Sequence, residues 1–158
     1  MIRVLFACLG NICRSPMAEA IFLDLIKKDR LTEYITVDSA GTESWHMGEE
    51  PHQETKEILT NNNISWKGLV ARQVDASDVN QFDYIIAMDD QNKHDLLQLF
   101  GASQQPIIIA KLMDFVNQPE KSNIPDPYYT GNFSDTYQLV LEGCQQLLQF
   151  IKEKHSIS

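Results

Sequence analysis

The chain has 158 residues with an ordinary apolar content of 43% and charged content of 22%, which suits one globular domain spanning residues 1–158. A net charge of −9 without a basic stripe argues against nucleic acid as a partner. No stretch approaches the ~20 apolar residues of a membrane span, and no signal peptide is expected. The three cysteines, an odd number, predict no disulfide framework and favour a reducing, cytoplasmic location.

Short apolar segments alternate with amphipathic ones along the chain. In order, we expect a strand at Ile2–Cys8, a helix at Pro16–Lys28, a strand at Ile35–Ser39, a helix at Pro51–Asn62, a strand at Tyr84–Met88, a helix at Gln91–Phe100 that stops at Gly101, a strand at Pro106–Ala110 and a helix at Ser134–Lys154. This order predicts an α/β fold, a doubly wound four-stranded parallel sheet of flavodoxin-like layout with helices on both faces. Such folds bind ligands at the carboxyl ends of their strands.

The segment that joins the first strand to the first helix has the sequence ACLGNICRSP over residues 7–16. Ser15 is expected to cap the helix and Pro16 to occupy its first position. The loop thus leads into a helix N-terminus, where free N–H groups and the helix dipole attract anions. Gly10 and Asn11 tolerate a left-handed backbone, which lets several N–H groups turn inward. This pattern predicts a cradle for a phosphate.

Cys8 and Arg14 add reactive chemistry to this loop. Arg14 carries a fork of donors that matches two phosphate oxygens, and the same cation stabilises a thiolate at Cys8. A thiolate held beneath a phosphate is placed to attack phosphorus, although a lone Cys after a buried strand is more often a small core residue. Dinucleotide and P-loop glycine patterns are absent, and the separation of Cys8 from Cys13 is not that of a zinc or thioredoxin motif.

The stretch CLGNICRSP, from Cys8 to Pro16, resembles the signature of the low-molecular-weight protein tyrosine phosphatases. The sequence DPYY at residues 126–129 is similar to the general-acid loop of that family. The segments SAGT at 39–42, ARQ at 71–73 and MD at 88–89 match in the same order. The resemblance covers most of the chain and implies that its partners are phosphotyrosine-containing proteins.

The resemblance implies a mechanism without cofactor or metal, in which Cys8 forms a phosphocysteine and Asp126 acts as general acid and then as base. Arg14 and the loop bind the phosphate, or another oxyanion, and Ser15 donates a hydrogen bond to the Cys8 sulfur. Cys13 forms a reversible disulfide with Cys8. The expected substrate-binding residues are Leu9, Gly10, Asn11, Ile12, Cys13, Ser15, Trp45, Tyr128 and Tyr129, with Ser39 and Asp89 in support.

Several of these assignments have plainer alternatives. Asp126 could only open a turn, Trp45 is equally suited to cap the core, and Asp89 could cap the next helix instead of orienting Arg14. Helical spacing places Cys144 in the core. The four histidines, His46, His52, His94 and His155, show no metal-ligand grouping and are expected at the surface.

One position departs from the family pattern. Many members have a histidine two residues before the Ala71 match, where it braces the asparagine and serine of the loop. Leu69 stands at this place here. We therefore expect the bracing network around Asn11, Ser15 and Ser39 to be smaller or to use water.

Other functions stay open on the sequence. An arsenate reductase shares the fold and loop but needs further cysteines downstream, where only Cys144 stands. A non-hydrolytic phosphocysteine carrier would need neither Asp126 nor Arg14. Protein-arginine phosphatases resemble this sequence but tend to carry Thr where Ile12 stands, and an apolar Ile favours an aromatic ring. A flavodoxin-type binding module would retain flavin on purification.

Overall fold

The computed structural model describes residues 1–101 and 107–157. Its elements, in chain order, are β1 (Ile2–Cys8), α1 (Arg14–Lys28), β2 (Ile35–Gly41), α2 (Gln53–Asn61), the 3-10 helix η1 (Ala76–Asn80), β3 (Tyr84–Ala87), α3 (Asp90–Phe100), β4 (Ile108–Lys111), the 3-10 helix η2 (Leu112–Phe115), α4 (Pro127–Thr130) and α5 (Phe133–Lys154). Each predicted strand and helix has a counterpart, most with ends shifted by one to three residues. The segments η1, η2 and α4 were not predicted, and Pro106, the predicted start of the fourth strand, lies outside the described residues.

The four strands are parallel and lie in the order β2-β1-β3-β4. The chain leaves β1 toward one side to form β2 and then returns to the other side of β1 to form β3. This order matches the flavodoxin-like arrangement, whose ligand site lies where the strand order reverses. The predicted fold class is confirmed, and the position between β1 and β3 is where a ligand is expected.

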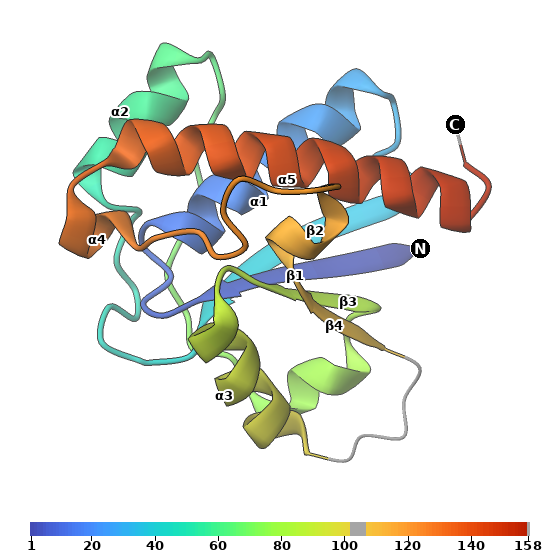
Figure 1. Ribbon diagram of the computed structural model, residues 1–158, viewed down its shortest axis with the longest axis horizontal. Coiled ribbons are helices and arrows are strands. Elements are labelled where there is room, and N and C mark those ends of the chain that lie inside the picture. The colour runs from blue at the N-terminus through green and yellow to red at the C-terminus, as the bar shows by residue number, and fades with distance from the viewer. Residues whose placement is uncertain (102–106, 158) are drawn as a thin grey trace.

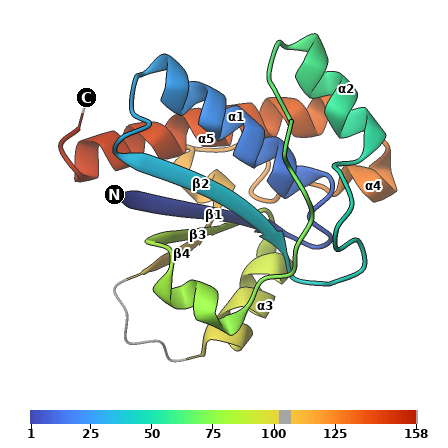
Figure 2. The same cartoon turned by 180° about the vertical axis from the view of Figure 1, so that it is seen from behind.

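Helices cover both faces of the sheet. Helices α1, α2 and α5 lie over one face, and α3 and η1 lie over the other (Figures 1 and 2). Val4 and Phe6 of β1 belong to the larger core cluster, whereas Leu5 and Ala7 belong to the smaller cluster on the opposite face. All four side chains are fully buried, which explains why β1 is an unbroken apolar run rather than an alternating one.

The start of the first helix differs from the prediction. Helix α1 begins at Arg14, and Cys13 is its N-cap without any side-chain hydrogen bond. Ser15 does not cap the helix because its hydroxyl contacts the side chains of Cys8 and Asn11 instead. Pro16 still falls in the first turn, where its missing N–H breaks no helical hydrogen bond.

The carboxyl ends of the strands gather the loops that carry the motif residues. In Figure 1, the loop before α1 and the short helix α4 lie at one end of the sheet, and both chain termini lie at the other.

None of the helices within 1–101 and 107–157 combines the length and apolar character that crossing a membrane demands.

Candidate active site

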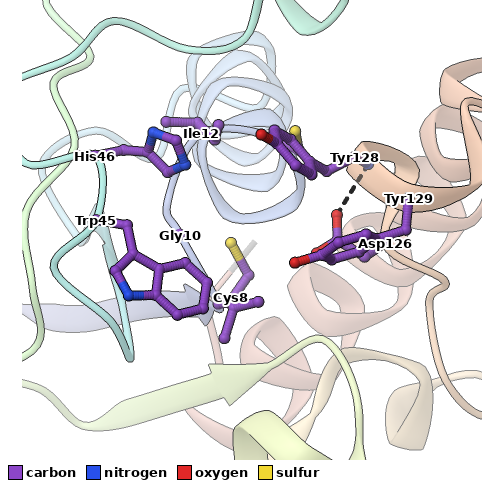
Figure 3. Close-up of a pocket in the computed structure, with 10 residues that line it drawn as sticks. Cys8, Gly10, Ile12, Trp45, His46, Asp126, Tyr128 and Tyr129 are labelled. Carbon is purple, nitrogen blue, oxygen red and sulfur yellow. Dashed lines mark hydrogen bonds between the residues drawn. The ribbon is translucent and has the colours of Figure 1, made fainter.

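One pocket at the carboxyl end of the sheet brings together three segments that are distant in the sequence. Figure 3 shows the Cys8 sulfur near its centre, with Trp45 and His46 on one side and Asp126 and Tyr129 on the other. The segments are the β1–α1 loop, the loop after β2 and the start of α4. The lining residues are Cys8, Leu9, Gly10, Ile12, Cys13, Trp45, His46, Asp126, Tyr128 and Tyr129.

The β1–α1 loop is held by its carbonyl oxygens. The oxygens of Cys8, Leu9 and Ile12 accept backbone N–H groups of Thr42, Glu43 and His52, at distances of 2.8, 3.0 and 2.8 Å. Asn11 between them adopts a left-handed backbone with φ of 58°. Alternation of right- and left-handed residues lines up successive N–H groups around a concave site that suits an anion.

The Cys8 sulfur lies at the start of α1 and is nearly inaccessible, with 2% of the residue exposed. The backbone N–H of Ser15 points at this sulfur from 3.4 Å, and the Ser15 hydroxyl lies 3.0 Å from it. Both groups can donate a hydrogen bond to a thiolate. The sulfur also benefits from the positive end of the helix dipole.

Arg14 is the largest fully buried side chain of the protein, at 2% exposure. It donates to Asp89 at 2.6 Å, to the carbonyl of Ile124 at 2.9 Å and to Asp126 at 3.3 Å. Burial alone would lower the pKa of its guanidinium, but the charges of Cys8, Asp126 and Asp89 outweigh burial and raise the pKa above its ordinary value. Arg14 therefore stays charged inside the protein.

Asp89 satisfies both interpretations of its sequence position. Its Oδ1 caps α3 by accepting the N–H of Asn92 at 2.8 Å, and its Oδ2 accepts from Arg14. A single carboxylate thus ties the end of β3 to the loop cation. The two alternatives left open by the sequence are not exclusive.

Asp126 is held at the mouth of the pocket by the helix that follows it. Its Oδ1 accepts the N–H of Tyr128 at 3.0 Å and caps α4, while its Oδ2 faces Arg14. The end of β3 fixes this loop as well, since the Ile124 N–H donates to the carbonyl of Met88 at 3.0 Å. Asp126 opens a turn and also points its carboxyl into the pocket.

Three aromatic side chains surround the mouth. Trp45, Tyr128 and Tyr129 are 62%, 53% and 69% exposed, and the two tyrosine rings meet edge to face at 5.3 Å. Trp45 therefore does not cap the core, and it lines the pocket instead. Exposed aromatic rings around a small polar floor form a site that can take a flat ring ending in an anion.

The comparisons with known proteins agree with this geometry. Residues 3–157 match the family described as low molecular weight phosphotyrosine protein phosphatase. The chain belongs to this family. It is 50% identical to the low molecular weight protein-tyrosine-phosphatase YfkJ of Bacillus subtilis, over 99% of this chain and all of that protein. It is 44% identical to PtpA of Staphylococcus aureus, another protein of that description, over 96% of this chain and 94% of PtpA.

Solved structures support the same assignment. The crystal structure of YfkJ superposes with a TM-score of 0.93 over 98% of this chain and 96% of that chain. The crystal structure of DARP, the Drosophila arginine phosphatase, superposes with a TM-score of 0.89 at 36% identity, over 96% and 98% of the two chains. The protein is therefore placed among the protein-tyrosine phosphatases, with a fold shared by an arginine phosphatase.

A network of hydrogen bonds centred on Asn11 braces the loop of this family member. The Asn11 amide donates to the hydroxyls of Ser15 and Ser39 at 2.7 and 3.0 Å, and the Ser39 hydroxyl donates to Glu19 at 2.6 Å. Leu69 lines a small cavity beside Asn11 and Ser39. One branch of the network ends on a carboxyl group of α1.

Glu19 occupies an unusual environment for a carboxyl group. Burial raises its pKa to about 7, against the hydrogen bond from Ser39, and the nearby charge of Asp38 raises it further. No pattern in the sequence indicates this role, because Glu19 stands within an amphipathic helix, where an acidic residue is ordinary. Only the packing of α1 against the carboxyl-terminal half of β2 brings it to Ser39.

Cys13 follows in the same loop as the nucleophile candidate and is buried as well. It is 3% exposed, and burial together with the charges of Cys8 and Asp126 raises its pKa to about 12. Cys13 is consequently a neutral thiol at physiological pH. Cys144 is fully buried in α5, where its spacing predicted it.

The four histidines are all at least partly exposed, as expected, but two of them also take part in the site or its support. His46 lines the pocket, and its Nδ1 lies 2.7 Å from a carboxylate oxygen of Glu49. His52 caps α2 and stacks on Phe133 at 4.9 Å. The sequence signal was the position of His46 directly after Trp45.

Across the described ranges, no group of three or more His, Cys, Asp or Glu side chains could hold a metal ion.

Proposed function

We propose that the protein removes phosphate from tyrosine side chains of proteins through a covalent phosphocysteine on Cys8. The observation that carries the proposal is the composition of one pocket, with the Cys8 sulfur at its floor and the Asp126 carboxyl at its mouth. The buried Arg14 guanidinium contacts that carboxyl. Membership of the family supports the same reaction class.

In the first step, the loop N–H groups and Arg14 bind the phosphate oxygens, and the Cys8 thiolate attacks phosphorus. The S–P bond forms as the P–O bond to the tyrosine breaks, and Asp126 gives its proton to the departing oxygen.

In the second step, Asp126 accepts a proton from water as the water oxygen attacks phosphorus. The S–P bond breaks, the pair of electrons returns to the Cys8 sulfur, and inorganic phosphate is released. The Ser15 hydroxyl, 3.0 Å from the sulfur, stabilises the thiolate as it leaves. Every charge that develops is met by a group of the protein itself, so this mechanism uses no cofactor or metal.

The walls of the pocket support an aromatic substrate. Ile12 is 7% exposed and lines the floor, while the rings of Trp45, Tyr128 and Tyr129 stand at the mouth. A phenyl ring buries its faces against such groups, whereas a guanidinium needs polar partners. Phosphoarginine is the second candidate, because DARP shares the fold at 36% identity.

The other functions fit less well. A relay disulfide in an arsenate reductase would have to reach Cys144, which is fully buried and whose sulfur lies 3.7 Å from the carbonyl of Ala18.

All three cysteines are free, which supports a cytoplasmic location. The net charge of −9 makes proteins, and not nucleic acid, the expected partners.

A direct comparison of substrates tests the proposal. Phosphate release is measured side by side from phosphotyrosine, phosphoarginine and phosphoserine peptides of the same sequence. We expect phosphotyrosine to be hydrolysed fastest, and Cys8→Ser to abolish turnover while retaining phosphotyrosine binding, because Arg14 and the loop remain. Cys144→Ala is the matched control and should keep its activity. Faster hydrolysis of phosphoarginine, or substantial turnover by Cys8→Ser, would contradict the proposal.

A further inference from the structure

The side chain of Asn11 fixes the direction of the hydrogen bonds that reach the Cys8 sulfur. Its Oδ1 accepts the backbone N–H of Arg72 at 3.0 Å, so the amide nitrogen must face the hydroxyls of Ser15 and Ser39. The Ser15 oxygen accepts from this nitrogen at 2.7 Å. Its own proton then has two acceptors within reach, the sulfur at 3.0 Å and the carbonyl of Ala40 at 3.4 Å, and the sulfur is the nearer one. The N–H of Arg72 is the outermost donor of this chain.

The guanidinium of Arg72 anchors that donor on the side away from the pocket. It contacts Asp38 of β2 at 3.0 and 3.3 Å and Asp78 of η1 at 3.1 and 3.2 Å. Burial lowers the pKa of Arg72, but the hydrogen bond to Asp78 and the charge of Asp38 outweigh it and raise the pKa. The backbone is held on this side too, since the Arg72 carbonyl accepts the N–H of Gly41 at 2.8 Å.

Both anchors of Arg72 belong to regular elements of the fold, although the Asp38 side chain is 46% exposed. Asp38 lies in β2, and the Asp78 side chain is only 9% exposed and also accepts the N–H of Asp75 at 2.7 Å. Arg72 itself does not line the pocket. It stands on the far side of Asn11, which has a left-handed backbone that its side-chain contacts must maintain.

We propose that Arg72 is a positioning residue of the phosphatase: its guanidinium, clamped by Asp38 and Asp78, holds its own N–H against Asn11 and thereby aims the Ser15 hydroxyl at the nucleophile. This inference rests on the proposed function, in which Cys8 forms the phosphocysteine. The planar fork of arginine reaches both carboxylates at once. A lysine at this place has one point charge and can hold only part of the clamp.

The Ser15 hydroxyl stabilises the sulfur as a leaving group, so Arg72 should act mainly on hydrolysis of the phosphocysteine. Arg72→Met is expected to slow this step by roughly 10- to 100-fold, the scale of a small misplacement in an active site. Arg72→Lys should give a smaller loss. Phosphocysteine should then accumulate, seen as a larger burst of the aryl alcohol and as phosphorylated Cys8 by mass spectrometry after acid quench.

A double-mutant cycle with Ser15→Ala separates positioning from a general loss of structure. If Arg72 acts through Ser15, Arg72→Met and Arg72→Lys should cost little more in the Ser15→Ala background than Ser15→Ala alone. Arg3→Met is the matched control. It removes another arginine that contacts a carboxylate, Asp83, on a strand end away from the loop, and should leave the burst unchanged.

Different results would contradict the positioning role of Arg72 and the phosphocysteine mechanism. Equal slowing by the Arg72 substitutions in both backgrounds, or no slowing at all, would overturn the positioning role and leave the phosphatase mechanism intact. If Arg72→Met does not fold, Arg72→Lys decides by the same comparison. A wild-type protein that hydrolyses aryl phosphates without ever carrying phosphate on Cys8 would overturn the proposed mechanism itself.

Discussion

Replacing Glu19 with glutamine tests how much stability the protein loses by burying the carboxyl group at the end of the bracing network. Burial raises the pKa of this carboxyl from its ordinary 4.5 to about 7. In the unfolded chain the group ionises near pH 4.5, whereas in the folded protein it keeps its proton to about pH 7. The folded state therefore loses stability relative to the unfolded state as the pH rises from 4.5 to 7, and the full cost persists above pH 7.

The size of this cost follows from the two pKa values. At about 1.4 kcal/mol per pH unit, the ionisation of Glu19 costs about 1 kcal/mol at pH 5 and about 3 kcal/mol at pH 8. Glutamine has nearly the same shape and does not ionise. Glu19→Gln should therefore raise the free energy of unfolding more at pH 8 than at pH 5, by roughly 2–3 kcal/mol.

Urea unfolding of both proteins at the two pH values measures this difference. All other titrating groups are common to the two proteins, so their contributions cancel in the comparison. Glu33→Gln, at an exposed carboxyl, is the matched control and should show no such pH dependence. An effect of Glu19→Gln that is the same at pH 5 and pH 8 would refute the argument that this carboxyl is forced to ionise in a poorly solvated place.

Three further predictions follow from the site and the core. Asp126→Asn should slow phosphorylation of Cys8 by roughly 10²–10⁴ for basic leaving groups and much less for nitrophenol, measured by single-turnover kinetics; equal slowing for all leaving groups would contradict a proton donor. Mild peroxide should link Cys8 reversibly to Cys13, detected by peptide mass spectrometry, whereas direct over-oxidation of Cys8 with Cys13 still reduced would exclude protection. Gly143→Ala should destabilise the protein by about 1–3 kcal/mol in urea unfolding, because its Cβ would collide with the Leu112 side chain; a gain in stability would show that η2 can move aside.

Much of the fold could be predicted because burial on both faces leaves a strong pattern. Strand β1 was predicted to the residue, since its apolar run and the glycine-containing loop after it mark both ends. The start of α1 could not be predicted in the same way. Ser15 has the chemistry of a helix cap, but its hydroxyl is taken by Cys8 and Asn11, and this preference depends on the folded loop.

The residues of the site also differ in whether a local sequence pattern predicts them. Cys8 and Arg14 were identified from a local pattern, and the resemblance to a family added Asp126, which no local pattern could connect to them across 112 residues. Glu19 stands in an ordinary amphipathic helix, His46 is marked only by its place directly after Trp45, and Arg72 only by the match of residues 71–73 to the family. None of these positions indicates a role by itself, because the roles arise from contacts between elements that meet only in the folded chain.

The buried position of Arg14 has a consequence for the folding of the site. The contact of Cys8 with Ser15 closes over seven residues, and the contacts that hold the cradle to Thr42, Glu43, His52 and Arg72 all close shorter loops than the contacts of Arg14 with the Ile124–Asp126 segment, so the cradle costs less chain entropy to form. The contacts of Arg14 with Ile124 and Asp126 close loops of 110 and 112 residues, and they depend on a segment that ends in the four-residue helix α4. If this segment opened locally, the cradle would still bind phosphate but would have no acid. Anion binding and proton donation thus belong to parts of the chain with different local stability, and hydrogen exchange should separate them.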